Sequence, residues 1–242
     1  MTNDILLELA GVHTHIGRYH ILHGVDLAVR RGRLTMLLGR NGAGKTTTLR
    51  TIMGLWRRSA GEIRFDGAPI GALATPDIAR LGIAYVPENM GIFAELTVRE
   101  NLLLATGPEG FDEARLEDVQ ALFPALREKW NNPAGSLSGG QKQMLAISRA
   151  IIEERRLLIV DEPTKGLAPA VIQLLIDAFL RLKGTATTIL LVEQNFHMAR
   201  SVGDDVAVMD DGRIVHTGSM AALAADEALQ QHLLGLSLAS HQ

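Results

Sequence analysis

Four short apolar runs stand out along the chain, and each is bounded by turn residues. Their apolar positions are continuous, whereas a strand with one solvated face would alternate apolar and polar residues. A strand that is buried on both faces, as in a parallel sheet covered by helices, has this continuous pattern. The sequence therefore predicts a buried, mainly parallel sheet built from residues 34–38, 82–86, 157–160 and 188–192.

The first 70 residues follow a different pattern. Short stretches at 5–9, 25–29 and 62–66 are separated by turn pairs such as Arg-Gly and Asp-Gly. Short strands joined by such turns favour antiparallel pairing. We therefore expect an antiparallel β subdomain ahead of the parallel sheet.

Residues 89–150 have the pattern of helices inserted between two buried strands. Thr97 and Glu100 have the spacing of a capping box, in which each side chain satisfies a backbone N–H of the other residue. A second helix is predicted over 112–123, with Pro124 ending or kinking it. Near the C-terminus, Ser219 is expected to cap a last amphipathic helix, and residues 238–242 are expected to be frayed.

Composition narrows the class of protein. The 242 residues suffice for one large domain or a domain with a subdomain, and 47% of them are hydrophobic. A net charge of −3 argues against nucleic acid as the main partner. The chain has no cysteine, no signal-peptide pattern at its start, and no run near the roughly 18 apolar residues of a membrane span. We therefore expect a cytoplasmic protein whose membrane role comes through partners.

A phosphate-binding loop is predicted directly after the run at 34–38. Residues 39–46, GRNGAGKT, fit the pattern G-x-x-x-x-G-K-[ST] between a strand and a helix. Backbone N–H groups and the helix N-terminus would bind the phosphates, Lys45 would reach the β- and γ-phosphates, and the Thr46 hydroxyl would ligate Mg²⁺. The predicted nucleotide-binding residues here are Gly39, Asn41, Gly42, Ala43, Gly44, Lys45, Thr46 and Thr47.

Two carboxylates follow the run at 157–160. Asp161 at the strand tip is predicted to hold Mg²⁺, and Glu162 could polarise the attacking water as a general base. A solvated acidic turn would be the alternative if no phosphate loop were present.

A second anion-binding helix start is predicted at residues 137–141, LSGGQ. Glycines and a serine at the N-terminus of a helix favour anions, although a simple helix cap would use the same residues. The predicted binding residues are Ser138, Gly139, Gly140 and Gln141.

With this loop, LSGGQ and an apolar strand ending in Asp-Glu, in this order, the chain resembles the nucleotide-binding subunit of an ABC transporter over essentially its whole length. The resemblance implies an α/β P-loop (RecA-like) core, formed with the β subdomain by residues 1–88 and 151–242, and a helical subdomain at 89–150. It also implies two subunits in a head-to-tail sandwich, where the LSGGQ segment of one chain binds the γ-phosphate of the ATP on the other.

Several positions depart from the usual pattern of the family. Glu88 stands where Gln is usual and serves here as a candidate Mg²⁺ ligand, Ala168 stands in place of an Asp, and Gln194 in place of a His. The usual aromatic residue for adenine stacking is missing at Ile16, and His15 or Tyr19 is the candidate substitute. These departures, with the segments at 12–14, 22–25, 91–102 and 166–169, resemble one ATP-binding subunit of the importers for branched-chain amino acids.

That resemblance implies a second ATP-binding subunit, two membrane permease subunits and, indirectly, a periplasmic binding protein. It also implies attachment to the inner face of the membrane. Relatives that carry urea or short amides look similar, and another amino acid is also an alternative cargo. A non-transport ABC ATPase and a regulator without turnover are further alternatives. Residues 90–93 could line the groove for a permease helix or belong to the core. Gln194 is predicted to position the γ-phosphate and water, or else to cap the next helix.

Overall fold

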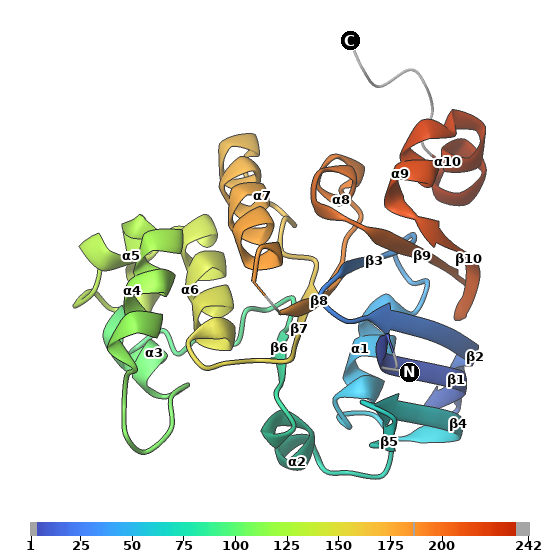
Figure 1. Cartoon of the computed structure of the whole chain (residues 1–242), viewed down its shortest axis with the longest axis horizontal. Helices are drawn as coiled ribbons and strands as arrows, with labels where there is room; N and C mark the ends of the chain where they lie inside the picture. The colour runs from blue at the N-terminus through green and yellow to red at the C-terminus, as the bar shows by residue number, and fades with distance from the viewer. Residues whose placement is uncertain (1–3, 186, 236–242) are drawn as a thin grey trace.

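The computed structural model describes residues 4–185 and 187–235, so the expected frayed tail lies outside the described residues. The molecule contains two β-sheets, of which sheet A lies at the lower right of Figure 1. Sheet A has the strand order β2-β1-β4-β5 and sheet B the order β10-β9-β3-β8-β7-β6. This mixed α/β architecture is the predicted fold class.

Sheet A is antiparallel, as predicted, but its two longest strands extend beyond the predicted stretches at 5–9 and 25–29. The strands β1 and β2 each have 12 residues, because bulges such as the one near Gly11 let the pairing continue where the apolar pattern breaks. The predicted turn at Asp66 and Gly67 has the positive φ values, 52° and 77°, that a two-residue hairpin loop requires. The strands are β1 (Ile5–Ile16), β2 (Tyr19–Arg30), β4 (Arg58–Phe65) and β5 (Ala68–Pro69).

Sheet B contains all four predicted buried strands. The five strands from β9 to β6 run parallel, and β10 pairs antiparallel with β9 at the edge. Every residue of β3, β7 and β8 is buried, which explains their continuous apolar runs. The strands are β3 (Leu34–Leu38), β6 (Ile83–Val86), β7 (Leu157–Asp161), β8 (Thr188–Val192), β9 (Asp205–Asp210) and β10 (Arg213–Ser219).

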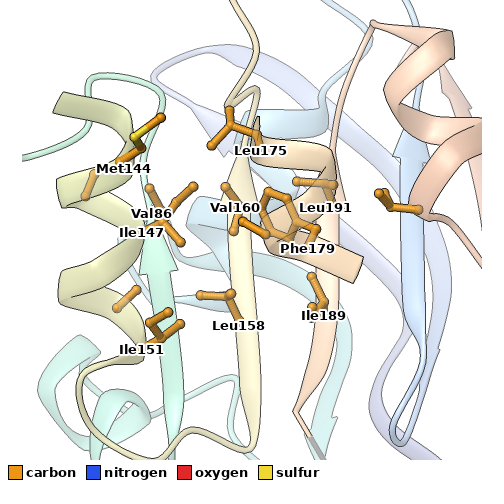
Figure 2. Packing of buried hydrophobic residues seen from close by; sticks show 14 of the residues in the cluster. Val86, Met144, Ile147, Ile151, Leu158, Val160, Leu175, Phe179, Ile189 and Leu191 are labelled. Carbon is orange, nitrogen blue, oxygen red and sulfur yellow. The ribbon is translucent and has the colours of Figure 1, made fainter. Parts of the chain in front are cut away.

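The two faces of sheet B belong to two separate cores. Val160 points from β7 into the core that it shares with Ile147 and Phe179 of the covering helices (Figure 2). Its neighbour Ile159 points the other way, into the core under sheet A that also contains Leu49. The central strands are therefore fixed from both sides, and so are the loops at their carboxyl ends.

Most of the predicted helix boundaries are confirmed. The Thr97–Glu100 capping box is present, and the predicted helix over 112–123 is α4, which ends before Pro124 opens α5. Ser219 caps α9, although a second helix, α10, follows it. The helices are α1 (Lys45–Ile52), α2 (Thr75–Arg80), α3 (Val98–Leu103), α4 (Glu113–Leu122), α5 (Pro124–Glu128), α6 (Gly139–Ile151), α7 (Pro169–Lys183), α8 (Phe196–Val202), α9 (Met220–Ala225) and α10 (Glu227–Leu234), with a 3₁₀ turn at Ala134–Ser136.

The helices divide into two groups. The helices α3 to α6, inserted between β6 and β7, gather at the left of Figure 1, away from sheet A. The helices α7 and α8 lie over sheet B. Among residues 4–185 and 187–235, none of the helices has the length and apolar character needed to cross a membrane.

Candidate active site

The loop between β3 and α1 brings the N-terminus of α1 to the carboxyl edge of sheet B. Gly39 has φ 148°, and a Cβ atom there would lie 2.2 Å from the carbonyl oxygen of Met209. Only glycine allows this close approach, which folds the loop over the start of the helix. The loop's backbone N–H groups and the positive end of the α1 dipole make this a site for anions such as phosphate.

Lys45 places a positive charge inside this loop. Its side chain is buried, and its Nζ donates hydrogen bonds to the carbonyl oxygens of Gly39 and Arg40 at 2.8 and 3.0 Å. The same Nζ lies 3.3 Å from Oε1 of Glu162. The ammonium group is therefore held at the centre of the loop, next to the predicted base.

Thr46 and Asp161 lie side by side. The Thr46 hydroxyl donates to Oδ1 of Asp161 at 3.2 Å, and the Tyr85 hydroxyl donates to Oδ2 at 3.4 Å. Burial raises the pKa of Asp161 above its usual value. A divalent cation beside this carboxylate would favour its ionised form.

These oxygen donors fit Mg²⁺, which proteins usually bind through one or two side chains together with phosphate oxygens. The described residues hold no group of three or more His, Cys, Asp or Glu side chains suited to a metal. In a Mg²⁺ site with one or two protein ligands, phosphate oxygens and water would supply the others.

Glu162 and Gln194 are in direct contact. Nε2 of Gln194 donates to Oε1 of Glu162 at 2.6 Å and to Oδ1 of Asn41 at 2.7 Å. The structure thus brings three predicted site residues together from the loops after β3, β7 and β8. Gln194 is exposed, so its amide is accessible from solvent.

The alternative that Gln194 caps the next helix is wrong. The N-cap of α8 is Asn195, whose Oδ1 accepts a hydrogen bond from the N–H of Met198 at 3.1 Å. Because the cap lies one residue later, the Gln194 side chain can reach Glu162.

Glu88 lies near this group but has a different partner. Its Oε1 accepts a hydrogen bond from Nζ of Lys165 at 2.6 Å, and both side chains are exposed. Its negative charge contributes to the raised pKa of Asp161. Its place in the Mg²⁺ shell stays a prediction.

Comparisons with known proteins agree with this geometry. A family model described as "ABC transporter" matches residues 22–165, well over half of the chain. The chain belongs to the ABC transporter family. Members of this family are ATPases coupled to transport, so the chain is an ATP-binding subunit with the predicted P-loop fold.

Individual relatives cover nearly the whole chain. The "High-affinity branched-chain amino acid transport ATP-binding protein BraG" of Pseudomonas aeruginosa is 38% identical, covering 95% of this chain and 100% of its own. The "Probable branched-chain amino acid transport ATP-binding protein LivF" of Archaeoglobus fulgidus is 36% identical, covering 90% and 93%. A solved structure described as the ATP-binding subunit of an ABC transporter is 31% identical, with a TM-score of 0.79 and 96% of both chains covered.

The ABC signature segment, LSGGQ, begins α6. The N–H of Gln141 donates to Oγ of Ser138 at 3.3 Å, and the N–H of Ser138 donates to Oε1 of Gln141 at 3.0 Å. A Cβ at Gly140 would lie 2.6 Å from Cγ1 of Val171, so this glycine lets α6 pack closely on α7. Ser138 and Gly139 remain exposed at the helix start.

The two candidate side chains for base stacking have different surroundings. Tyr19 is 61% exposed, with the guanidinium of Arg18 5.3 Å from its ring centre. His15 is stacked on His20, with their ring centres 4.1 Å apart and the planes 7° from parallel, and its Nδ1 lies 3.0 Å from Oγ of Ser59. His15 is thus engaged within sheet A, whereas Tyr19 is open to solvent.

Residues 90–93 have different surroundings, some in the core and some at a groove or exposed to solvent. Met90 and Ile92 pack against the core that contains Val160. Met90 also lines a groove of about 640 Å³ that is bounded by α1, α2, β6 and α6. Phe93 is 49% exposed and lies under the guanidinium of Arg149, 5.0 Å from its ring centre.

Sequence reasoning missed Glu193. Glu193 lies between β8 and Gln194, and its buried carboxylate contacts Thr164 in the loop after β7. An acidic residue directly after a buried strand was the available signal.

Proposed function

We propose that this ABC subunit hydrolyses ATP to drive an importer for branched-chain amino acids. The observation that carries the proposal is the contact of Gln194 with Glu162, next to Lys45 in the phosphate loop. Two relatives named for this cargo match at least 90% of the chain, which supports the cargo class.

The proposed roles follow from the position of each side chain. Lys45 and the N–H groups of residues 39–47 bind the phosphates, while Thr46 and Asp161 hold Mg²⁺, with Glu88 at the edge of its shell. The metal ion would neutralise charge on the phosphate oxygens. Glu162 accepts a proton from the attacking water. Gln194 donates from its amide nitrogen to a phosphate oxygen and accepts from the water with its amide oxygen.

The proposed assembly needs a second ATP-binding subunit, either another copy of this chain or a different one. Ser138, Gly139, Gly140 and Gln141 offer a second anion-binding helix start, which would bind the γ-phosphate held by a partner ATP-binding subunit. Residues 89–150 act in this proposal as one helical subdomain. The groove of about 640 Å³ beside this subdomain would receive the membrane permease subunits. These subunits would place the chain on the cytoplasmic side of the membrane and link it to a periplasmic binding protein.

The first test compares Lys45→Ala with Lys129→Ala, which changes an exposed lysine of the helical part. The Lys45 variant should lose Mg-dependent ATP hydrolysis, because the ammonium group inside the phosphate loop is gone, and Lys129→Ala should hydrolyse ATP like the parent. Parental hydrolysis by Lys45→Ala would refute the site.

The second test addresses the cargo. Membrane vesicles that contain this subunit with its permease subunits and binding protein should take up leucine in an ATP-dependent manner. Uptake of urea without uptake of leucine, isoleucine or valine would replace the proposed cargo.

A further inference from the structure

Glu193 is a buried carboxylate to which the proposed chemistry gives no role. It follows β8 directly, and its side chain is 2% exposed. Among the described residues, no basic side chain forms an ion pair with it. A buried charge without an ion pair is costly unless hydrogen bonds compensate it.

Four donors surround this carboxylate, and they come from two different loops. Oε1 accepts from the N–H of Thr164 at 2.9 Å. Oε2 accepts from the Thr164 hydroxyl at 2.9 Å and from the N–H groups of Gln194 and Asn195 at 3.1 and 3.2 Å. The carboxylate therefore joins the loop after β7 to the loop after β8.

Both of these loops carry a group proposed for hydrolysis. Glu162 is two residues before Thr164, and Gln194 directly follows Glu193. Glu162 has φ 46°, a conformation that a non-glycine residue keeps only where its surroundings hold it. The hydrogen bond from the N–H of Glu162 to the carbonyl oxygen of Val192, at 3.0 Å, fixes one side of this residue, and the contacts of Thr164 with Glu193 fix the other.

We propose that Glu193 is a positioning residue for ATP hydrolysis, which fixes the loop of Glu162 against the loop of Gln194 and so keeps these two side chains in contact. An ionised carboxylate suits this task because it only accepts hydrogen bonds and has room for four donors. An amide of the same shape would turn its NH₂ group toward some of these donors and lose their hydrogen bonds.

The position of Glu193 determines which kinetic constant it affects. Its hydrogen bonds go to Thr164, Gln194 and Asn195, whereas Lys45 is held by carbonyl groups of the phosphate loop and Thr46 by Asp161. The loss of Glu193 should therefore slow turnover and leave ATP binding nearly unchanged. This expectation rests on the roles proposed above for Glu162 and Gln194.

The main test is the ATPase kinetics of Glu193→Gln in the purified subunit and in the assembled transporter. We expect kcat to fall about 10- to 100-fold, because a displacement of about 1 Å at a reacting group can cost that much, while KM for ATP stays within about threefold. Glu117→Gln, which changes an exposed carboxylate on α4, is the control and should match the parent.

Substitutions at Thr164 test the same contact from its other side. Thr164→Val removes only the hydroxyl that donates to Oε2 of Glu193, and kcat should fall by less than in Glu193→Gln, again without a change in KM. Thr164→Ser keeps the hydroxyl and should recover most of the parental kcat. If Glu193→Gln fails to fold, the two Thr164 variants still test the proposal. Equal rates for Thr164→Val and the parent would overturn it.

A double-mutant cycle separates a positioning role from a general loss of stability. If Glu193 acts through Gln194, Glu193→Gln combined with Gln194→Ala should be little slower than Gln194→Ala alone. Fully additive losses would overturn the proposal. A parental rate for Gln194→Ala would refute the proposed role of Gln194, whereas a parental rate for Glu193→Gln beside a slow Gln194→Ala would refute the role of Glu193.

Discussion

Gln194 carries a neutral amide at a position where the ABC transporter family usually has a histidine, which can titrate. Its Nε2 contacts both Glu162 and Asn41, so the group is already oriented toward the predicted base. Gln194→Ala should reduce turnover about 10- to 1000-fold, a rise in barrier of about 1.4 to 4 kcal/mol, with little change in ATP binding. ATPase rate and nucleotide affinity, measured together, check this, and an unchanged rate would leave Gln194 without a catalytic role.

Replacing Gln194 by histidine tests why the residue is neutral. Gln194→His should retain substantial activity, because an imidazole can also donate to a phosphate oxygen. It should gain a pH dependence between about 6 and 7.5, where histidine titrates and an amide does not. A variant whose pH–rate profile matches the parent's would contradict this account.

Glu88 is predicted to be a Mg²⁺ ligand, but its observed contact is with a lysine. It pairs with Lys165, yet its charge still acts on the carboxylate of Asp161. Glu88→Gln should raise the Mg²⁺ concentration needed for half-maximal ATPase rate, because one negative charge near the metal is lost. Lys165→Met is the control, because it removes the positive charge that pairs with Glu88. In this variant the Mg²⁺ concentration for half-maximal rate should stay the same or fall. An unchanged Mg²⁺ dependence in Glu88→Gln would remove Glu88 from the metal shell.

At the scale of the elements, hydrogen bonds to the carboxylate of Glu193 hold the turn from β8 to α8. Because this carboxylate is buried, its contribution to the stability of the subunit depends on pH. Burial raises the pKa of Glu193 above 4.5, so this group contributes stability that is present below pH 4.5 and lost as pH rises through the folded-state pKa. Glu193→Gln should therefore destabilise the subunit more at low pH than at neutral pH. Denaturant unfolding of parent and variant from about pH 4.5 to 8 measures this difference, and a constant difference across the range would contradict the prediction.

Sequence patterns predict the bounds of some strands and not of others. The bounds of β3 and β8 match the predicted runs, since strands buried on both faces leave a continuous apolar signal. The lengths of β1 and β2 could not be predicted in this way, because bulges interrupt their periodicity. The contact between Thr164 and Glu193 was also out of reach, because it depends on β7 and β8 being neighbours in the sheet, which their order along the chain does not fix.

At the scale of the whole molecule, two helix starts are proposed to bind phosphate, those of α1 and α6. Of these two, the α1 start adjoins the loop with the buried Lys45. The start of α1 belongs to the phosphate loop, while the exposed start of α6 makes hydrogen bonds within its own capping box. A head-to-tail pair of cassettes would use both, since two-fold symmetry gives two equivalent composite sites. ATP binding and the association of subunits should therefore be coupled.

Glu162→Gln tests this coupling and the base role together. The carboxamide keeps the shape of the side chain beside Gln194 and Lys45, but it cannot accept a proton from water. The variant should bind ATP, hydrolyse it poorly, and accumulate as a dimer with MgATP, because the closed pair cannot complete the reaction that opens it. Light scattering with MgATP and with MgADP measures the dimer, and the double variant Lys45→Ala/Glu162→Gln should stay monomeric in both. Full activity of Glu162→Gln would assign the base to another residue, and an inactive variant that binds MgATP yet stays monomeric at high concentration would refute a sandwich of two copies of this chain.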